Sequence, residues 1–259
     1  MPEPLVLSEV RERVAVLRIN NPPANAMSLA LLEALTDAIR RALDDGSKVI
    51  ILTGQGGNFC AGANIGELHA LSGSAAAAEF SQRGQALCEL IETAPKPIIA
   101  AINGRYALGG GVELLLACHL RLMEASTQIG SPEVRLGLMV GWGGSQRLPR
   151  LVGAGRALDL LLTGRRIGAD EALAMGLVNR VVPDGTVAEE ALKLAADLAA
   201  LSGPVLAGTL RAVLAGLRQG YAVGLPAERA EFAALCDHAD WREGTSAFME
   251  KRPPRFVDG

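Results

Sequence analysis

Two short, almost entirely apolar runs, Lys48–Thr53 (KVIILT) and Lys96–Ile102 (KPIIAAI), constrain the fold more than any other feature of the chain. Runs of this length bounded by turn residues are typical of strands buried on both faces. A helical pattern at about Leu29–Leu43 precedes the first run, and another at about Ala75–Thr93 separates the two. Strands that alternate with helices form parallel sheets whose faces the helices cover. The sequence therefore predicts an α/β fold with a parallel sheet.

The segments on either side of this alternation extend the prediction. LVLSEV and VAVLRI flank Arg11–Arg13 and indicate a short hairpin ahead of the first helix. After the second apolar run come a glycine run, a helix that ends near Cys118, and a strand at about His119–Glu124. We expect these elements to join the same sheet and its covering layer.

Beyond about Gly153 the chain is mostly helical, with one short strand in LVNRVV. After a break at Ser202–Pro204 we expect helices at about Val205–Leu217, Leu225–His238 and Trp241–Glu250. Their alanines and leucines lie on more than one face, and a helix with so much apolar surface packs on another surface. We expect a partner subunit to provide that surface. We divide the chain into a core, residues 1–200, and a C-terminal helical region, residues 201–259.

The charge balance argues against several function classes. The chain has 25 Lys and Arg against 28 Asp and Glu, a net charge of −3, and an isoelectric point near 5.7. This is unlike the basic footprint of a nucleic-acid or anionic-membrane binder.

No run approaches the roughly 18 uncharged apolar residues of a membrane span, so no such span is predicted. Charges interrupt the apolar N-terminal segment, so no signal peptide is predicted. We expect a soluble, cytoplasmic protein.

The cysteines and histidines show no ligand spacing. We interpret the four cysteines as reduced core thiols and the three histidines as packing or surface residues, and we predict no metal site. These residues are Cys60, Cys88, Cys118, Cys236, His69, His119 and His238.

The stretch Tyr106–Leu114 (YALGGGVEL) places three glycines where a buried helix begins. Glycine costs roughly 1 kcal/mol against alanine at a helical position, so the run calls for a reason. A helix N-terminus presents free N–H groups, and glycine lets a ligand approach the backbone with no Cβ in the way. The run lacks the lysine and the spacing of phosphate-binding loops. What remains is a donor site for an oxygen that carries or develops negative charge.

Two carboxylates accompany this run. Glu113 lies in the first turn of the predicted helix. It faces either the donor site at the glycine run or solvent, where its charge would only interact favourably with the helix dipole. Glu133 follows twenty residues later in GSPEVRLGL, where Pro132 also allows a capping interpretation. If the two converge on one pocket, one can act as acid and the other as base.

The loop FCAGANIG follows the first apolar strand and can supply a second N–H group. Stabilisation of an oxyanion usually needs two donors. The residues alone therefore favour an α/β enzyme that stabilises an enolate-like oxygen and moves protons with two carboxylates.

At these residues the sequence resembles the enoyl-CoA hydratase/isomerase (crotonase) superfamily. The likeness runs in order through NPPANAMS, FCAGANI, KPIIAAINGRYALGGGVEL, SPEVRLGL, GWGGSQRLPRLVG, LTGRRIGADEALAMGLVNRVV and REGTSAFMEKRPPRF. The resemblance implies a crotonase-like spiral core of repeated ββα units, with a C-terminal helical region for trimerisation. It implies a homotrimer, or a homohexamer built as a dimer of trimers.

The resemblance also implies an acyl-CoA thioester substrate, with its oxygen held by the N–H groups of Ala63 and Gly110. It implies syn addition of water to a trans-2-enoyl-CoA, giving a 3-hydroxyacyl-CoA. Glu113 would activate the water and Glu133 would protonate the α-carbon, although both carboxylates would bond the same water. No cofactor is implied, because coenzyme A is part of the substrate. The substrate-binding positions are Ala61, Asn64, Ile65, Gly141 and Lys251.

Three departures from the family pattern concern substrate affinity rather than reaction type. Asn64 stands where aspartate is usual, Gly66 where lysine is common, and Val140 where proline is frequent.

The alternatives to a hydratase are a Δ3-Δ2-enoyl-CoA isomerase, which needs one carboxylate, and a non-catalytic or RNA-binding member. Acyl-chain length and pathway, including fatty-acid β-oxidation, stay open.

Overall fold

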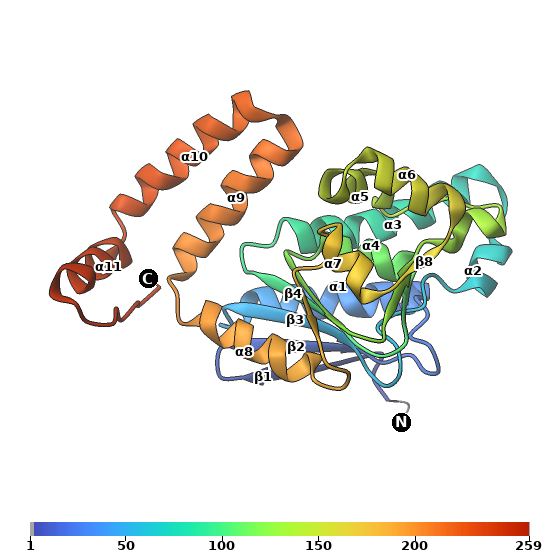
Figure 1. The fold of residues 1–259 in the computed structure, drawn as a ribbon, viewed down its shortest axis with the longest axis horizontal. Helices are drawn as coiled ribbons and strands as arrows, with labels where there is room; N and C mark the ends of the chain where they lie inside the picture. The colour runs from blue at the N-terminus through green and yellow to red at the C-terminus, as the bar shows by residue number, and fades with distance from the viewer. Residues whose placement is uncertain (1–2, 259) are drawn as a thin grey trace.

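The computed structural model describes residues 3–258 of the 259-residue chain (Figure 1). It begins with strands β1 (Val6–Arg11) and β2 (Val14–Ile19), which pair antiparallel. Glu12 turns the chain between them with a φ of 55°. The predicted hairpin is confirmed.

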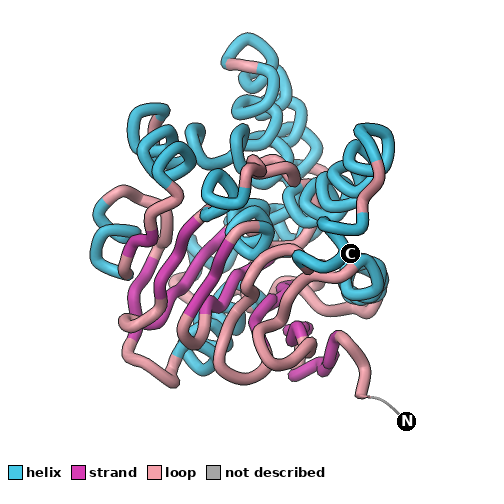
Figure 2. The backbone as a smooth tube through the Cα atoms, turned by 90° about the vertical axis from the view of Figure 1, so that its right-hand side faces the viewer, coloured by secondary structure: helices cyan, strands magenta, loops and turns pink. Residues whose placement is uncertain are grey.

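The larger sheet has the strand order β1-β2-β3-β4-β6-β9, and every pair after the hairpin is parallel. Figure 2 shows these strands side by side. The strands that follow the hairpin are β3 (Val49–Gly54), β4 (Ile98–Ile102), β6 (Leu120–Glu124) and β9 (Arg180–Val182). The predicted α/β fold with a parallel sheet is confirmed.

Alternate residues of each central strand enter different hydrophobic clusters. Ile50 and Ile98 face helices α1 (Leu29–Asp44), α3 (Gly73–Glu92) and α4 (Gly110–Ala117). Their neighbours Val49 and Ile99 pack with α8 (Val187–Ala199) instead. Because both faces are covered, the strands are apolar throughout, which explains the two runs that dominate the sequence.

A smaller sheet, with the order β5-β7-β8, determines where the glycine run lies. Its strands are β5 (Tyr106–Leu108), β7 (Gln128–Gly130) and β8 (Arg166–Ile167). These strands are too short to show a sequence period, and β5 and β8 were not predicted. Around this sheet lie α2 (Ile65–Ala70), the 3₁₀-helix η1 (Pro132–Leu136), α5 (Gly144–Val152), α6 (Ala154–Thr163) and α7 (Ala169–Ala174).

The remaining helices form what we call the C-terminal arm: α9 (Gly203–Gln219), α10 (Tyr221–Cys236) and α11 (Ala239–Glu250). Figure 1 shows α9 and α10 as a helical hairpin that projects from the core. The chain end returns to the base of the arm, where Asp258 accepts a hydrogen bond from Gly203 N at 2.7 Å and pairs with Lys48 at 2.8 Å. The arm leaves several large apolar side chains more than half exposed: Val213, Leu217, Tyr221, Phe232, Phe248 and Met249.

Within residues 3–258 no single helix is long and apolar enough to cross a membrane. Helices α8 and α9 reach that length and composition only together, as a pair bent by 104°.

Candidate active site

The glycine run joins β5 to α4 through a turn that only glycine adopts easily. Gly109 has a φ of +53° and a ψ of −124°, outside the regions open to residues with a Cβ. Its N–H donates to Gly130 O at 2.9 Å, which ties the turn to β7. Helix α4 then begins at Gly110 with no side-chain cap. Its first N–H groups therefore have no capping side chain to accept from them.

Each glycine of the run also has a steric reason of its own. A Cβ at Gly109 would lie 2.8 Å from Glu133 Oε1, and one at Gly110 would lie 2.4 Å from the Trp142 ring. A Cβ at Gly111 would lie 2.5 Å from Cys60 O. In the sequence alone, the approach of a ligand explains the run. The structure adds a second reason: at each of the three glycines, other protein atoms lie where a Cβ would be.

The loop after β3 lies directly against this turn. Gly62 has a φ of +95°, and a Cβ there would lie 3.0 Å from Leu108 O and 3.5 Å from Gly110 N. Met27 N donates to Gly62 O and Asn64 N donates to Met27 O, so the loop is held on both sides of Ala63. Within residues 3–258, no oxygen accepts a hydrogen bond from the N–H of Ala63 or Gly110. The two predicted donors are thus neighbours with free N–H groups.

Glu113 is buried, with only 3% of its surface exposed. Its Oε1 accepts hydrogen bonds from Trp142 N at 2.6 Å and Gly144 N at 2.7 Å, and its Oε2 accepts a longer one from Gly141 N at 3.4 Å. The carboxylate therefore caps the N-terminus of α5. The alternative of a solvent-exposed Glu113 is wrong.

Burial raises the pKa of Glu113 to about 7, even though the backbone N–H groups favour its ionised form. The negative charge of Glu133 acts in the same direction as burial. A carboxylate with a pKa near neutrality exchanges a proton readily under physiological conditions. Such a shift, in a site with a second carboxylate, is typical of catalytic groups.

Glu133 is in the first turn of η1, beside the Gly109 turn. Its Oε2 is fully buried and has no hydrogen-bond partner among the described residues. Burial raises the pKa of this carboxyl group as well. An unpartnered buried oxygen needs either a proton or an incoming donor such as water. The two carboxylates therefore meet at the glycine turn in different surroundings.

The other positions assigned from the resemblance divide into two groups. Ala61, Asn64 and Ile65 are on the Ala63 loop and at the start of α2, and the Asn64 side chain caps α2 by accepting from Gly66 N at 2.9 Å and Glu67 N at 3.3 Å. Asparagine in place of aspartate therefore keeps the loop's hydrogen bonds. Lys251 caps the end of α11, and α11 lies at the opposite end of the molecule from α2 (Figure 1). One subunit does not bring Lys251 to this site.

Sequence reasoning assigned Gly141 to the site but missed the two other groups that hold Glu113. The N–H groups of Trp142 and Gly144 come from a segment about 30 residues further along the chain, and backbone donors leave no side-chain signature. The Trp142 ring packs against Phe80, with ring centroids 5.7 Å apart, and lies against Gly110. The one available signal was the glycine pair in GWGGSQR, which marks a helix start.

Comparisons with known proteins identify the family and the fold. Residues 9–259 match the sequence profile of the enoyl-CoA hydratase/isomerase family. A probable enoyl-CoA hydratase of Bacillus subtilis is 43% identical over 249 residues, covering 95% of this chain and 96% of its own. A crotonyl-CoA hydratase of Syntrophomonas wolfei is 41% identical and covers 97% of each chain. The solved structure of Pseudomonas aeruginosa DspI superposes with a TM-score of 0.93 at 37% identity, over 98% of this chain and 97% of that one.

Proposed function

The chain belongs to the enoyl-CoA hydratase/isomerase family and has its fold, and we propose that it is an enoyl-CoA hydratase. It adds water to the double bond of a trans-2-enoyl-CoA and gives a 3-hydroxyacyl-CoA. The observation that carries this proposal is the pairing of Glu113 and Glu133 beside the free N–H groups of Ala63 and Gly110. The name of the Syntrophomonas wolfei relative makes crotonyl-CoA the first substrate to test.

The two free N–H groups bind the thioester oxygen. Addition of water to the β-carbon moves negative charge onto this oxygen, and fixed donors stabilise that charge by about 3 kcal/mol each. Because the loops around Gly62 and Gly109 are fixed by backbone hydrogen bonds, the donors need no rearrangement during the reaction. No group beyond these residues and the coenzyme A portion of the substrate enters the proposed mechanism.

Glu113 activates the water and Glu133 protonates the α-carbon. N–H donors bond only to an acceptor oxygen, so Glu113 is held as the proton acceptor, while the unpartnered Oε2 of Glu133 is free to carry a proton. The water oxygen bonds to the β-carbon, its proton passes to Glu113, and the proton of Glu133 passes to the α-carbon. Exchange of one proton between the two carboxyl groups then restores the starting state.

The substrate contacts follow the same loop. Ala61, Asn64 and Ile65 flank the Ala63 donor and contact the coenzyme A portion, while Gly141 lies beside the carboxylate. Lys251 contributes to coenzyme A binding only from a neighbouring subunit, because α11 is remote from the site in its own chain.

We propose a homotrimer, or a dimer of trimers, assembled through the C-terminal arm, with residues 1–200 as the core and 201–259 as the helical oligomerisation region. The support is the exposed apolar surface of the arm, which a partner would cover. The expected mass in solution is three or six times the 27.0 kDa of one chain. A cytoplasmic location belongs to the same proposal and is supported by the buried free thiols Cys60, Cys88 and Cys118.

The test is the loss of the ultraviolet band of crotonyl-CoA, which belongs to the conjugated enoyl thioester. Hydration removes the conjugation, so the band must decline with fresh enzyme; a stable band would overturn the proposal. A 3-enoyl-CoA tests the isomerase alternative, because isomerisation makes the band appear. A series from short to long acyl chains then defines the preferred substrate.

A further inference from the structure

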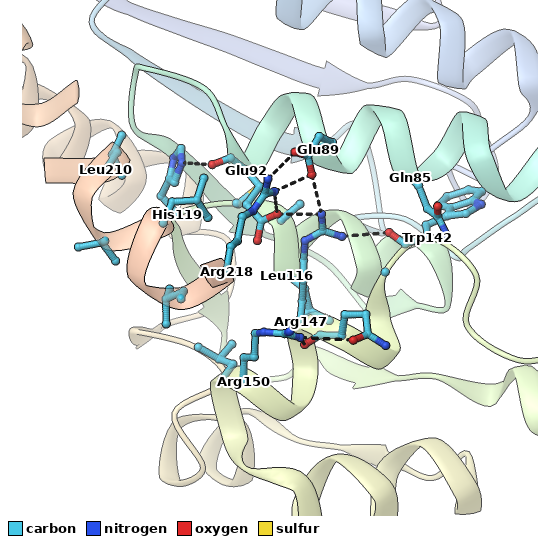
Figure 3. Close-up of a pocket in the computed structure, with 18 of the residues that line it drawn as sticks. Gln85, Glu89, Glu92, Leu116, His119, Trp142, Arg147, Arg150, Leu210 and Arg218 are labelled. Carbon is cyan, nitrogen blue, oxygen red and sulfur yellow. Dashed lines mark hydrogen bonds and ion pairs between the residues drawn. The ribbon is translucent and has the colours of Figure 1, made fainter. Parts of the chain in front are cut away.

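A cavity of about 760 Å³ lies behind the site, between α3, the end of α4, α5 and α9. Neither Glu113 nor Glu133 lines it, but Trp142 and Gly143, which precede α5, form part of its wall. Charged side chains that pair with one another line this cavity (Figure 3): Glu89 and Glu92 from α3, Arg147 from α5, and Arg218 from α9.

Arg147 connects this charge cluster to the catalytic turn. Its Nη1 donates to Trp142 O at 3.0 Å and its Nη2 donates to Glu92 at 2.9 Å (Figure 3). A Cβ at Gly143, whose φ is +107°, would lie 2.2 Å from Arg147 Nη1, so the guanidinium lies directly against the turn. Trp142 thus has its carbonyl held by Arg147 and its N–H bonded to Glu113.

Arg218 connects the same cluster to the C-terminal arm. It bonds both oxygens of Glu89 and shares Glu92 with Arg147. Burial raises the pKa of Glu92, but the hydrogen bonds from Arg147 and Arg218 outweigh it, and the pKa lies below its ordinary value. Glu92 is therefore an anion between two guanidinium groups, which keeps all three side chains in one arrangement.

We propose that Arg147 is a positioning residue that holds the Trp142–Gly144 turn against the Glu113 carboxylate. Glu92 and Arg218 in turn fix the position of Arg147. The packing of α9 against the core therefore contributes to the placement of Glu113. This inference rests on the proposed function for the role of Glu113. It adds a route by which the arm acts on the chemistry, since α9 contacts neither carboxylate through a hydrogen bond or ion pair among residues 3–258.

The test measures the titration of Glu113 in three variants. Arg147→Gln removes the link to Trp142, and Arg218→Gln removes the link to α9. Arg150→Gln is the matched control, because Arg150 lines the same cavity from α5 but, among the described residues, donates only to Gln146 within its own helix. Two titratable groups lie close to Glu113: Glu133 from η1, and Cys88 from α3, on which the Arg147 charge also acts. All three variants keep both of these side chains.

Looser N–H donors stabilise the ionised carboxylate less, so the pKa of Glu113 rises. For Arg147→Gln we expect the acid limb of the pH–rate profile to move to higher pH by about half a unit. We also expect kcat to fall roughly 10- to 100-fold with KM little changed, as for a misplaced catalytic group. Arg218→Gln should move the limb less, in the same direction, and Arg150→Gln should not move it. Loss of folded enzyme alone lowers the rate equally at every pH and leaves the limb in place.

A second measurement does not depend on activity. In a Trp241→Phe background, tryptophan fluorescence reports on Trp142 alone, whose backbone N–H bonds Glu113. The midpoint of the fluorescence change with pH should rise most in Arg147→Gln, less in Arg218→Gln, and not in Arg150→Gln. If the wild-type protein does not hydrate enoyl-CoA but the midpoints shift, the proposed function fails and the positioning network stands. If the midpoint of Arg147→Gln matches that of Arg150→Gln, the positioning role is overturned. An unchanged midpoint in Arg218→Gln overturns the contribution of α9.

Discussion

The N–H of Gly144 donates to Glu113 Oε1 at 2.7 Å, so a carboxylate on α4 caps the first turn of α5. One side chain thereby joins two helices, while its second oxygen, Oε2, has only the longer hydrogen bond from Gly141 N at 3.4 Å. The positive end of the α5 dipole favours the ionised form of this carboxylate, while burial opposes it. These opposing effects place the pKa near neutrality, where a general base is most effective.

Glu113→Gln should lower kcat by about 100- to 10,000-fold, the usual contribution of a general base. The glutamine oxygen can still accept from Trp142 and Gly144, so the fold and substrate binding should persist. Steady-state hydration of crotonyl-CoA measures the effect. Glu124→Gln is the control: Glu124 is also buried but accepts hydrogen bonds from Gly104 N and Gly185 N away from the site, so it should lose stability and keep its rate. Full activity in Glu113→Gln would contradict the two-carboxylate mechanism.

Glu133→Gln should lower kcat to a similar degree, because the amide N–H groups are far too weakly acidic to deliver a proton to the α-carbon. The change should not reduce stability, since Oε2 of Glu133 has no hydrogen-bond partner to lose within residues 3–258. Rates and melting temperatures of the two glutamine variants, measured side by side, separate these roles. A marked drop in melting temperature for Glu133→Gln alone would mean that its carboxylate is structural.

The sheet could be predicted because its signal is local. Val49 and Ile50 face opposite layers, and both must be apolar, so the run itself reveals a buried strand. The predicted helices Leu29–Leu43 and Ala75–Thr93 end within two residues of α1 and α3 for the same reason. Periodicity along a few turns is enough to place such elements.

The surroundings of the site could not be predicted, because they are made by contacts between distant segments. Gly109, Gly110 and Gly111 each exclude a Cβ for a different neighbour, namely Glu133, Trp142 and Cys60. Those neighbours lie up to about 50 residues away in the sequence, and no local pattern records them. The direction of Glu113 stayed open for the same reason: a helix start allows both an inward and an outward carboxylate, and only the position of α5 decides.

Stability should depend on pH through Glu113. Its pKa rises from 4.5 to about 7 on folding, so the folded protein keeps a proton that the unfolded chain has lost between these pH values. The stability from this group is therefore fully present below pH 4.5 and lost as pH rises to 7, by about 3 kcal/mol. Glutamine does not titrate, so the free energy of unfolding of Glu113→Gln, relative to wild type, should increase between pH 5 and pH 8 in urea titrations. A constant difference would show that the pKa of Glu113 is not raised.

Gly110→Ala should damage both stability and activity. The added methyl would lie 2.4 Å from the Trp142 ring, and such overpacking costs about 1–3 kcal/mol. It should also displace the Gly110 N–H from the thioester oxygen. Gly155→Ala on α6 is the matched control, since nothing lies within 4 Å of its Cβ position, and alanine should stabilise that helix by up to about 1 kcal/mol. Equal melting temperatures for the two variants would contradict the packing seen around Gly110.

Phe248→Asp tests the role of the C-terminal arm. Phe248 is 85% exposed in the single chain, so a charge there should leave the fold of one subunit intact. If the arm forms the subunit contact, the same charge is buried without a partner in the oligomer, which is strongly unfavourable. Light scattering coupled to size exclusion should then show the variant shifted toward the 27.0 kDa monomer at low protein concentration. Val10→Asp, at an exposed position of edge strand β1, should keep the wild-type mass. A Phe248→Asp protein that retains the wild-type mass would show that this part of the arm lies outside the contact, because an uncompensated charge could not remain within it.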